Sequence, residues 1–485
     1  MKSKTVFSNF IWRFAERCGA QLVSAIVSVI LARLLMPADY GVVAMVTVFI
    51  TVLNVFISNG LGNALIQKKN ADDTDFSTVF YTNIVFCLTL YTLLFLASPL
   101  ISRFYNRPEM TPMLRVLGLV LIISGVKNIQ MAYVSRNMQF KRFFFATLGG
   151  TLASCVLSIA MAYWGYGIWA LVALHLVGYT VNTAILWFTV EWRPGRLFSL
   201  RRLKGLLAYG WKLLAASFLD TVYLQLYPLL IGARFPKEEL GQFDKGRNWP
   251  DQITQSINAS IDGVLLPVLS AEQDDKHRVR EMTRRAIKTS SYVMMPLMAG
   301  LAVCAEPLVH LLLGEEWMPC VPFLQIFCVI YAFYPLHTAN LNAIKAMGRS
   351  DVFLALEILK KLVETGALLV TLRYGVFAMA LGQLASSILA QIINAWPNRK
   401  LLDYPYLRQL LDLLPALLLS AAMGAAVWTV TRLGLRDILT LLIQVPMGAA
   451  LYVLGSWLLK LESFTFLIST AKKMLHRSTE GEKHG

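Results

Sequence analysis

The chain has 485 residues, of which 56% are hydrophobic and 15% are charged, and its mean hydropathy is +0.56. Soluble globular domains have about 25% charged residues, so this composition excludes an ordinary soluble protein and indicates a membrane protein. The net charge of +16 does not indicate a nucleic-acid partner, because most of the 45 Lys and Arg residues fall in loops on one side of the predicted helices. That bias is the positive-inside rule, which predicts that both termini are cytoplasmic.

Stretches of about 20 mostly apolar residues predict transmembrane helices. The sequence predicts an all-α polytopic membrane protein with about 14 such spans. No small-residue cleavage site follows the first span, so we expect a retained helix rather than a signal peptide. The predicted spans cover residues 10–34, 41–66, 77–101, 112–134, 143–164, 167–190, 207–233, 243–268, 289–313, 320–343, 352–372, 376–396, 409–431 and 437–459.

Four short similarities, each at an offset of about 200 residues, indicate an internal repeat. The pairs are Trp12-Arg13 with Trp211-Lys212, LARLLMPADYG (31–41) with IGARFPKEELG (231–241), Asp72-Asp73 with Asp274-Asp275, and YGIWAL (166–171) with YGVFAM (374–379). Each repeat holds six spans, an even number, so both insert in the same orientation. The repeat therefore predicts two pseudo-symmetric six-helix lobes with a substrate path between them.

The predicted organisation follows from the repeat. We expect an N-terminal lobe, an amphipathic cytoplasmic linker on the inner leaflet, a C-terminal lobe, two further helices and a polar cytoplasmic tail. The corresponding ranges are 1–190, 191–206, 207–400, 401–460 and 461–485.

Polar residues recur every three to four positions in the first span, which places them on one face of a helix. Arg13, Arg17 and Gln21 form this stripe, and Glu16 lies three residues from Arg13. Charged groups inside a span are costly in lipid, so the stripe indicates a water-filled cavity. The alternative is that both arginines extend to the membrane interface and only anchor the helix.

The eighth predicted span is unusually polar, and the repeat rather than its hydropathy predicts it. Polar groups at membrane depth are tolerated where they face a bundle interior or an aqueous cavity. The alternative is a hydrogen-bond network between the lobes with no ligand. The candidate residues here are Arg247, Asp251, Gln252, Gln255 and Asn258, and the corresponding second span contributes Asn59.

The repeat also places cations on equivalent helices of the two lobes. We expect Arg13, Arg17, Lys212 and Arg247 to lie near the cytoplasmic mouth and to converge on one site. Guanidinium groups bind phosphate through paired hydrogen bonds, whereas neutral sugars suit the amides expected deeper in the cavity. This pattern predicts that the substrate is an amphiphile with an anionic linkage and a polar head group.

The sequence contains no Gly-rich phosphate loop and no CxxC pair, and its six cysteines fall in or beside spans. These features predict no nucleotide site, no zinc site and no disulfide framework. We therefore expect no cofactor, no metal site and no catalytic residue. Candidates for coupling to H+ or Na+ are Glu16, Asp220 and Asp251, since acids inside spans often carry ions.

Several stretches resemble a known family in the order in which they occur. LARLLMPADYG is similar to the signature that follows the first helix of bacterial polysaccharide transporters, and GQFDKGRNWPDQ (241–252) is similar to their eighth-helix motif. The stretches at 266–288, 305–327 and 346–361 follow in the family's order. The chain, over at least residues 10 to 400, resembles a Wzx-type oligosaccharide flippase of the multidrug/oligosaccharidyl-lipid/polysaccharide (MOP) superfamily.

The resemblance implies an alternating-access transporter rather than an enzyme, located in the bacterial inner membrane. The implied cargo is an undecaprenyl-diphosphate-linked oligosaccharide for O-antigen, capsule or exopolysaccharide export, and Arg13, Arg17 and Arg247 are the residues implied to hold its diphosphate. Membrane lipids and polysaccharide polymerase machinery are the partners that the resemblance allows, and nucleic acid is not among them.

Two other functions remain as alternatives. A multidrug or small-cation exporter of the same superfamily would favour acids over arginines in its cavity. A membrane glycan polymerase or ligase would be expected to carry catalytic groups in a sizeable external loop, whereas the predicted external loops are short.

Overall fold

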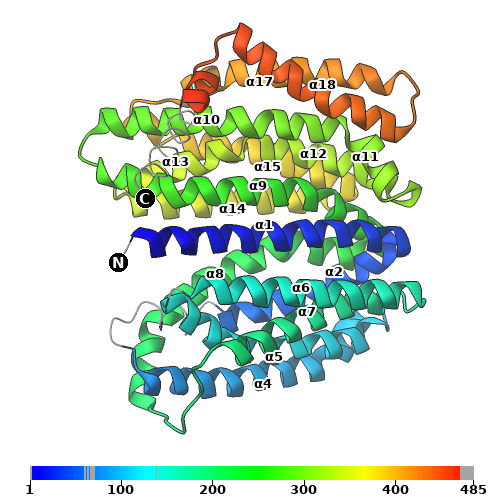
Figure 1. Cartoon of the computed structure of the whole chain (residues 1–485), viewed down its shortest axis with the longest axis vertical. Helices are drawn as coiled ribbons and strands as arrows, with labels where there is room; N and C mark the ends of the chain where they lie inside the picture. The colour runs from blue at the N-terminus through cyan, green and yellow to red at the C-terminus, as the bar shows by residue number, and fades with distance from the viewer. Residues whose placement is uncertain (1–2, 59–61, 63–64, 66–70, 138, 470–485) are drawn as a thin grey trace. The chain divides into compact units, whose positions relative to one another are not determined.

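The computed structural model describes the backbone of residues 3–58, 62, 65, 71–137 and 139–469. Side chains are described for the same residues except 3–18, 58, 140, 208–210, 212–213, 216, 259–260, 262–264 and 350. Within these ranges all regular structure is helical, which confirms the predicted all-α fold (Figure 1). The chain divides into two compact units, residues 1–241 and 242–485.

The described part of unit 1 is a bundle of long helices. α1 packs along α6, α6 along α7, and α5 contacts α2, α4 and α7, while α8 packs against α2 and α4. The helices are α1 (Ser3–Leu34), α2 (Pro37–Ser58), α4 (Asp73–Phe104), α5 (Met110–Arg136), α6 (Phe140–Tyr163), α7 (Ile168–Thr189) and α8 (Leu200–Arg234).

Unit 2 begins within α9 (Lys237–Ala271), whose first turn belongs to unit 1. In unit 2, α10 packs against α12, α13 and α17, α14 against α15, and α17 lies beside α18 (Figure 1). The remaining elements are α10 (Lys276–Val303), α11 (Ala305–Leu312), the 3-10 helix η1 (Glu315–Cys320), α12 (Val321–Ala332), α13 (Tyr334–Ala346), α14 (Ser350–Thr371), α15 (Val376–Ala395), α16 (Asn398–Leu401), α17 (Tyr406–Thr431) and α18 (Asp437–Leu458).

A helix is present at every predicted span. In the part of the chain that the structure describes, 10 helical segments are long and apolar enough to cross a membrane. α9 and α14 are long but are not among them, because polar and charged residues lower their hydropathy. The side chains of α8 are described only in part, and the described part of α1 contributes a shorter apolar segment, Gly19–Leu34. The protein is a multi-pass membrane protein, and the number of 14 spans stays a prediction.

Two predicted spans differ from the observed helices. The span predicted at 289–313 joins two elements, because α10 ends at Val303 and α11 begins at Ala305. The span predicted at 320–343 is divided into α12 and α13 at Phe333. Pro335 is the second residue of α13 and has no backbone N–H, which is tolerated in the first turn of a helix.

Both Asp-Asp pairs of the repeat begin a helix. The Asp72 carboxylate accepts a hydrogen bond from the backbone N–H of Asp75 (3.0 Å). In turn, the Asp75 carboxylate accepts a hydrogen bond from the backbone N–H of Asp72 (3.2 Å). Asp275 accepts bonds from the backbone N–H groups of His277 (2.9 Å) and Arg278 (3.1 Å). These bonds satisfy N–H groups that have no partner inside the helix, so this part of the repeat is explained by helix capping.

The compact units and the predicted lobes divide the chain at different places. Residues 190–199 are not helical, and residues 200–206 form the first turns of α8 rather than a separate linker helix. Because α8 packs on α2 and α4, unit 1 extends to residue 241, whereas the repeat divides the chain between 190 and 207. The predicted lobes and the membrane-surface position of the linker stay predictions.

The capping box of α4 predicts a pH-dependent contribution to stability. Arg202 donates a hydrogen bond to Asp72 and holds the pKa of that carboxyl down at about 2. A lowered folded-state pKa stabilises the protein above the unfolded pKa of about 3.9, and the effect is lost as the pH falls toward 2. We expect Arg202→Gln to unfold at a lower temperature than wild type at pH 6, with the difference shrinking between pH 4 and pH 2. Thermal unfolding across this pH range measures it, and a difference that persists at pH 2 would contradict the pairing.

Candidate functional site

The predicted polar stripe of the first span lies on α1. The helix is continuous over Ser3–Leu34, so Arg13, Arg17 and Gln21 recur one turn apart on one face, as predicted. Gln21 is half-buried and has a partner. The side chains of Arg13, Glu16 and Arg17 lie outside the described part of the chain, so their roles stay predictions.

Two further candidates fall in the same unit. Lys212 and Asp220 both lie on α8, where eight residues correspond to about two turns. Asp220 is exposed and has a partner, whereas the side chain of Lys212 is not described. Asn59 lies outside the described residues.

Polar side chains form a row along one side of α9, which includes the predicted candidates Asp251 and Gln255. Asn248 donates a hydrogen bond to the Asp244 carboxylate (3.1 Å), and Gln255 donates to Asp251 (3.4 Å). Both bonds join residues four apart, the spacing that brings side chains together on a helix. The structure therefore brings Asp251 and Gln255 together, and Gln252 and Gln255 are exposed.

Arg247 is held by a network that joins α9 to α12. Its guanidinium interacts with the Tyr331 hydroxyl, which also interacts with Asp251, and the carboxylates of Asp244 and Asp251 attract it. One cation is thus balanced by nearby carboxylates inside unit 2. A phosphate that binds Arg247 must compete with the electrostatic attraction of Asp244 and Asp251 for the same guanidinium.

A close helix contact positions this network. A Cβ atom on Gly246 would lie 2.8 Å from the carbonyl oxygen of Cys320 and 2.8 Å from Cβ of Phe323, so only glycine lets α9 approach η1 and α12 this closely. Next to it, Lys245 is only 4% exposed, and its ammonium lies 5.4 Å from the centre of the Trp317 ring. This cation–π contact stabilises a charge that is otherwise removed from water.

The contacts of Asn258 are those of a structural residue, as in the alternative interpretation of the eighth span as a hydrogen-bond network with no ligand. The residue is buried, and its side-chain oxygen accepts a hydrogen bond from the hydroxyl of Thr338 on α13 (2.5 Å). A buried amide held in this way stabilises helix packing. Its predicted contact with substrate stays a prediction.

The position of Arg247 along α9 does not agree with its predicted place at the cytoplasmic mouth. At 1.5 Å per residue, Arg247 lies about 15 Å from Lys237 and about 36 Å from Ala271. In the predicted topology α9 begins on the external side, so Arg247 falls in the external half of its span. The expected convergence of Arg247 with Arg13, Arg17 and Lys212 at the cytoplasmic end is therefore incompatible with that topology. The reason is that α9 runs in the opposite direction to α1 and α8 in the predicted topology, so a residue early in α9 lies toward the external side.

Sequence reasoning missed two members of the network. Asp244 lies one turn before Arg247 on the same polar face, so its spacing is a signal that could have found it. Tyr331 lies in an apolar stretch of α12, far along the chain, and no feature of that stretch indicates its contact with Arg247.

The fold is similar to that of a solved membrane protein. The structure is similar to the lipid II flippase MurJ in an inward closed conformation, with a TM-score of 0.72 over 93% of this chain and 98% of MurJ, at 16% sequence identity. At that identity the similarity shows the fold. The chain thus has the fold of a multi-pass membrane transporter, which is the predicted class.

Sequence comparisons then give the family. A family model described as "Polysaccharide biosynthesis protein" matches residues 30–322, more than half of the chain, and the chain belongs to this family. The lipopolysaccharide biosynthesis protein WzxC of Escherichia coli (strain K12) is 24% identical over 413 residues, which cover 81% of this chain and 82% of WzxC. The succinoglycan biosynthesis transport protein ExoT of Rhizobium meliloti (strain 1021) is 22% identical over 367 residues, 76% of this chain and 74% of ExoT. These findings confirm the resemblance found in the sequence.

Proposed function

We propose that this protein is a flippase that moves an undecaprenyl-diphosphate-linked oligosaccharide across the bacterial inner membrane by alternating access. This step would serve the export of a surface polysaccharide such as O-antigen, capsule or exopolysaccharide. The observation that carries the proposal is the presence of arginines within long membrane helices of a polysaccharide biosynthesis family member. Arginine binds phosphate through paired hydrogen bonds, and a charge inside a span is costly unless it has a use.

The cations form two groups in this proposal. Arg13, Arg17 and Lys212, on α1 and α8, meet the diphosphate first from the cytoplasmic side, and Arg247 meets it later in the external half of α9. The exposed amide of Gln255 is a candidate to bind sugar hydroxyls. The prenyl chain stays in lipid, which requires no polar partner.

The balanced charges around Arg247 support a coupling step. The Asp251 carboxylate attracts Arg247 when the diphosphate is absent, and both residues interact with Tyr331. Protonation of Asp251 removes this competitor, so uptake of H+ would favour binding of the diphosphate to Arg247. Glu16 and Asp220 are the other candidate groups for H+ or Na+, and no cofactor is part of the proposal.

The orientation in this proposal places both termini in the cytoplasm, which the distribution of Lys and Arg supports. Membrane lipids surround the helices, whose outward surfaces include many exposed apolar side chains. Polysaccharide polymerase machinery on the external side would consume the translocated product.

Loss of Arg17 is expected to slow flipping about 10- to 100-fold, because a charge-assisted hydrogen bond contributes about 1.5–3 kcal/mol. Proteoliposomes carrying the lipid-linked oligosaccharide in both leaflets are treated with an external glycosidase, which reports how fast glycan reaches the outer surface. Wild type and Arg17→Gln are compared at equal amounts of folded protein. Arg103→Gln, at an exposed position of α4, is the matched control and should flip at the wild-type rate.

The same assay separates the alternatives. A wild-type rate in Arg17→Gln would assign Arg17 to anchoring the helix. Cleavage of the lipid-linked substrate by the transporter itself, releasing free polyprenyl diphosphate, would favour a polymerase or ligase. Inhibition of flipping by cationic dyes, with no inhibition by excess lipid-linked glycan, would favour a multidrug exporter.

A further inference from the structure

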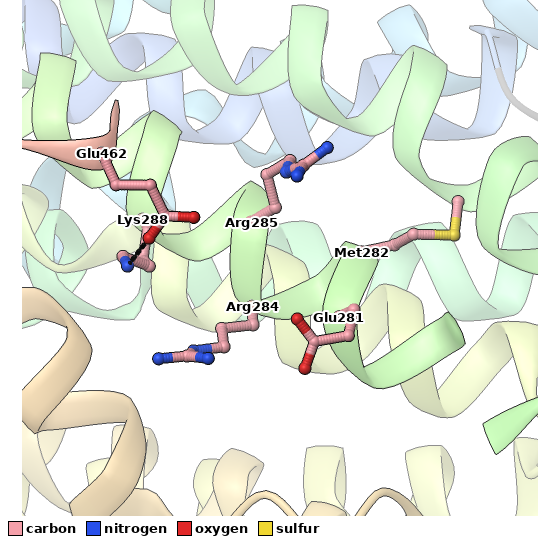
Figure 2. A pocket seen from close by; sticks show the side chains of 6 residues that line it. All are labelled: Glu281, Met282, Arg284, Arg285, Lys288 and Glu462. Carbon is pink, nitrogen blue, oxygen red and sulfur yellow. Dashed lines mark hydrogen bonds and ion pairs between the residues drawn. The ribbon is translucent and has the colours of Figure 1, made fainter. Parts of the chain in front are cut away.

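A basic pocket lies at the start of α10, beside the helical segment 462–469 that follows α18 (Figure 2). It consists of two adjoining cavities of about 150 Å³ and 410 Å³ that share Arg285, Lys288 and Glu462. Segment 462–469 is fixed against the unit, because Phe464 and Leu467 pack on the core cluster of Tyr292, Met423 and Tyr452. The pocket is thus a formed feature of unit 2.

Two of its cations are already neutralised by carboxylates. Arg284 donates two hydrogen bonds to Asp412 (2.8 and 2.6 Å), which also accepts one from the hydroxyl of Tyr404 (2.7 Å). Lys288 pairs with Glu462 and holds the pKa of that carboxyl below its usual value. Both pairs are therefore ionised at neutral pH and leave little net charge.

Glu281 also lines the smaller cavity and lies 3.9 Å from Arg280, so Arg285 and Lys460 are the cations of the pocket that remain. Within the described part of the chain, neither Arg285 nor Lys460 has a carboxylate in ion-pair distance. The Arg285 guanidinium lies over the Phe466 ring, 4.9 Å from its centre, and still has its N–H groups available to an anion. The hydroxyl groups of Thr289 and Ser463 also line the larger cavity and can donate to an anion, whereas those of Thr465 and Ser469 donate to the backbone carbonyls of Leu461 and Phe466.

The surface beside the pocket identifies the source of the anion. Trp457, Leu458 and Leu459 immediately precede Lys460 and are 66%, 69% and 62% exposed. Exposed apolar residues at the end of a membrane helix contact acyl chains and the interface, where tryptophan is enriched. A phosphate held by Arg285 and Lys460 would therefore be attached to acyl chains lying on this surface.

We propose that Arg285 and Lys460 form a binding site for the head group of an anionic phospholipid. Basic pockets between membrane helices bind anionic lipid head groups through the same combination of charge and adjacent apolar surface. The volume of the larger cavity is within the range of ordinary ligand sites. The site is separate from α1, α8 and α9, and the inference does not depend on the flippase function.

Native mass spectrometry of the full-length protein in neutral detergent tests the site. With dioleoyl phosphatidylglycerol added, we expect one lipid bound tightly to wild type, and affinity about tenfold lower in Arg285→Gln/Lys460→Gln. Dioleoyl phosphatidylcholine should bind equally weakly to both. Arg399→Gln, an exposed cation of α16 outside the pocket, is the control and should retain wild-type binding.

Three further arms decide between sources and guard against misfolding. Arg285→Lys changes the same side chain but keeps its positive charge, so it should retain most of the binding. If Arg285→Gln loses binding while Arg285→Lys retains it, the loss follows from the charge and not from a change in the packing of residue 285. Inorganic phosphate should not displace the lipid at millimolar concentration, and displacement by it would overturn the assignment to a lipid. Equal phosphatidylglycerol binding by wild type and the double variant would also overturn the proposal. So would a higher affinity of this site for polyprenyl diphosphate than for phosphatidylglycerol.

Discussion

Gly241→Ala is expected to destabilise the protein by about 3 kcal/mol or more, an unusually large effect for the addition of one methyl group. A Cβ atom on Gly241 would lie 2.1 Å from the carbonyl oxygen of Pro37 and 2.9 Å from its carbonyl carbon. These are backbone atoms, so no side chain can rotate away. The reciprocal contact is equally close, because a Cβ on Gly41 would lie 1.8 Å from the carbonyl oxygen of Lys237.

Gly300→Ala provides the matched comparison for this prediction. Gly300 is a helical glycine of α10 with nothing within 4 Å of the position a Cβ would take, and alanine is favoured over glycine inside helices by about 1 kcal/mol. Thermal unfolding in detergent should therefore show a lower midpoint for Gly241→Ala and an equal or higher one for Gly300→Ala. Equal midpoints for the two variants would show that the first turns of α2 and α9 are not in contact as the structure has them.

Gly41 and Gly241 also show how far sequence reasoning reached. They end the repeat stretches LARLLMPADYG and IGARFPKEELG, so the sequence indicated that the two positions correspond. It did not indicate that they touch each other. A repeat identifies equivalent local structure, whereas a contact between equivalent elements depends on packing.

For the helices too, local sequence predicted where a helix forms, whereas contacts between distant segments could not be predicted. Hydropathy predicted the apolar helices, and the repeat predicted α9, which is too polar to be found by hydropathy. The breaks at Cys304 and Phe333 were missed because both stretches stay apolar across them. At the site, the spacing on α9 indicated that Arg247 and Asp251 share a face. The interaction of Tyr331 with both residues depends on how α12 packs against α9, which the sequence does not indicate.

Arg247→Gln is expected to reduce flipping of the lipid-linked oligosaccharide about 10- to 100-fold, in the proteoliposome assay described for Arg17. The same change removes a positive charge that attracts the carboxylates of Asp244 and Asp251. Removing the positive charge leaves the partly buried carboxylates to repel each other, so the variant is also expected to unfold at a lower temperature. A lower rate in Arg247→Gln alone would therefore not distinguish binding from folding.

Arg247→Gln/Asp251→Asn separates the two roles, because it removes one positive and one negative charge together. If Arg247 binds the diphosphate, the double variant recovers thermal stability toward wild type while flipping stays slow, since no guanidinium is left to bind phosphate. If Arg247 serves only to balance Asp251, stability and flipping recover together, and the assignment of Arg247 to the substrate is wrong. Asp251→Asn alone completes the comparison: it frees Arg247 from its competitor, so we expect diphosphate binding to strengthen and flipping to lose its dependence on an imposed proton gradient.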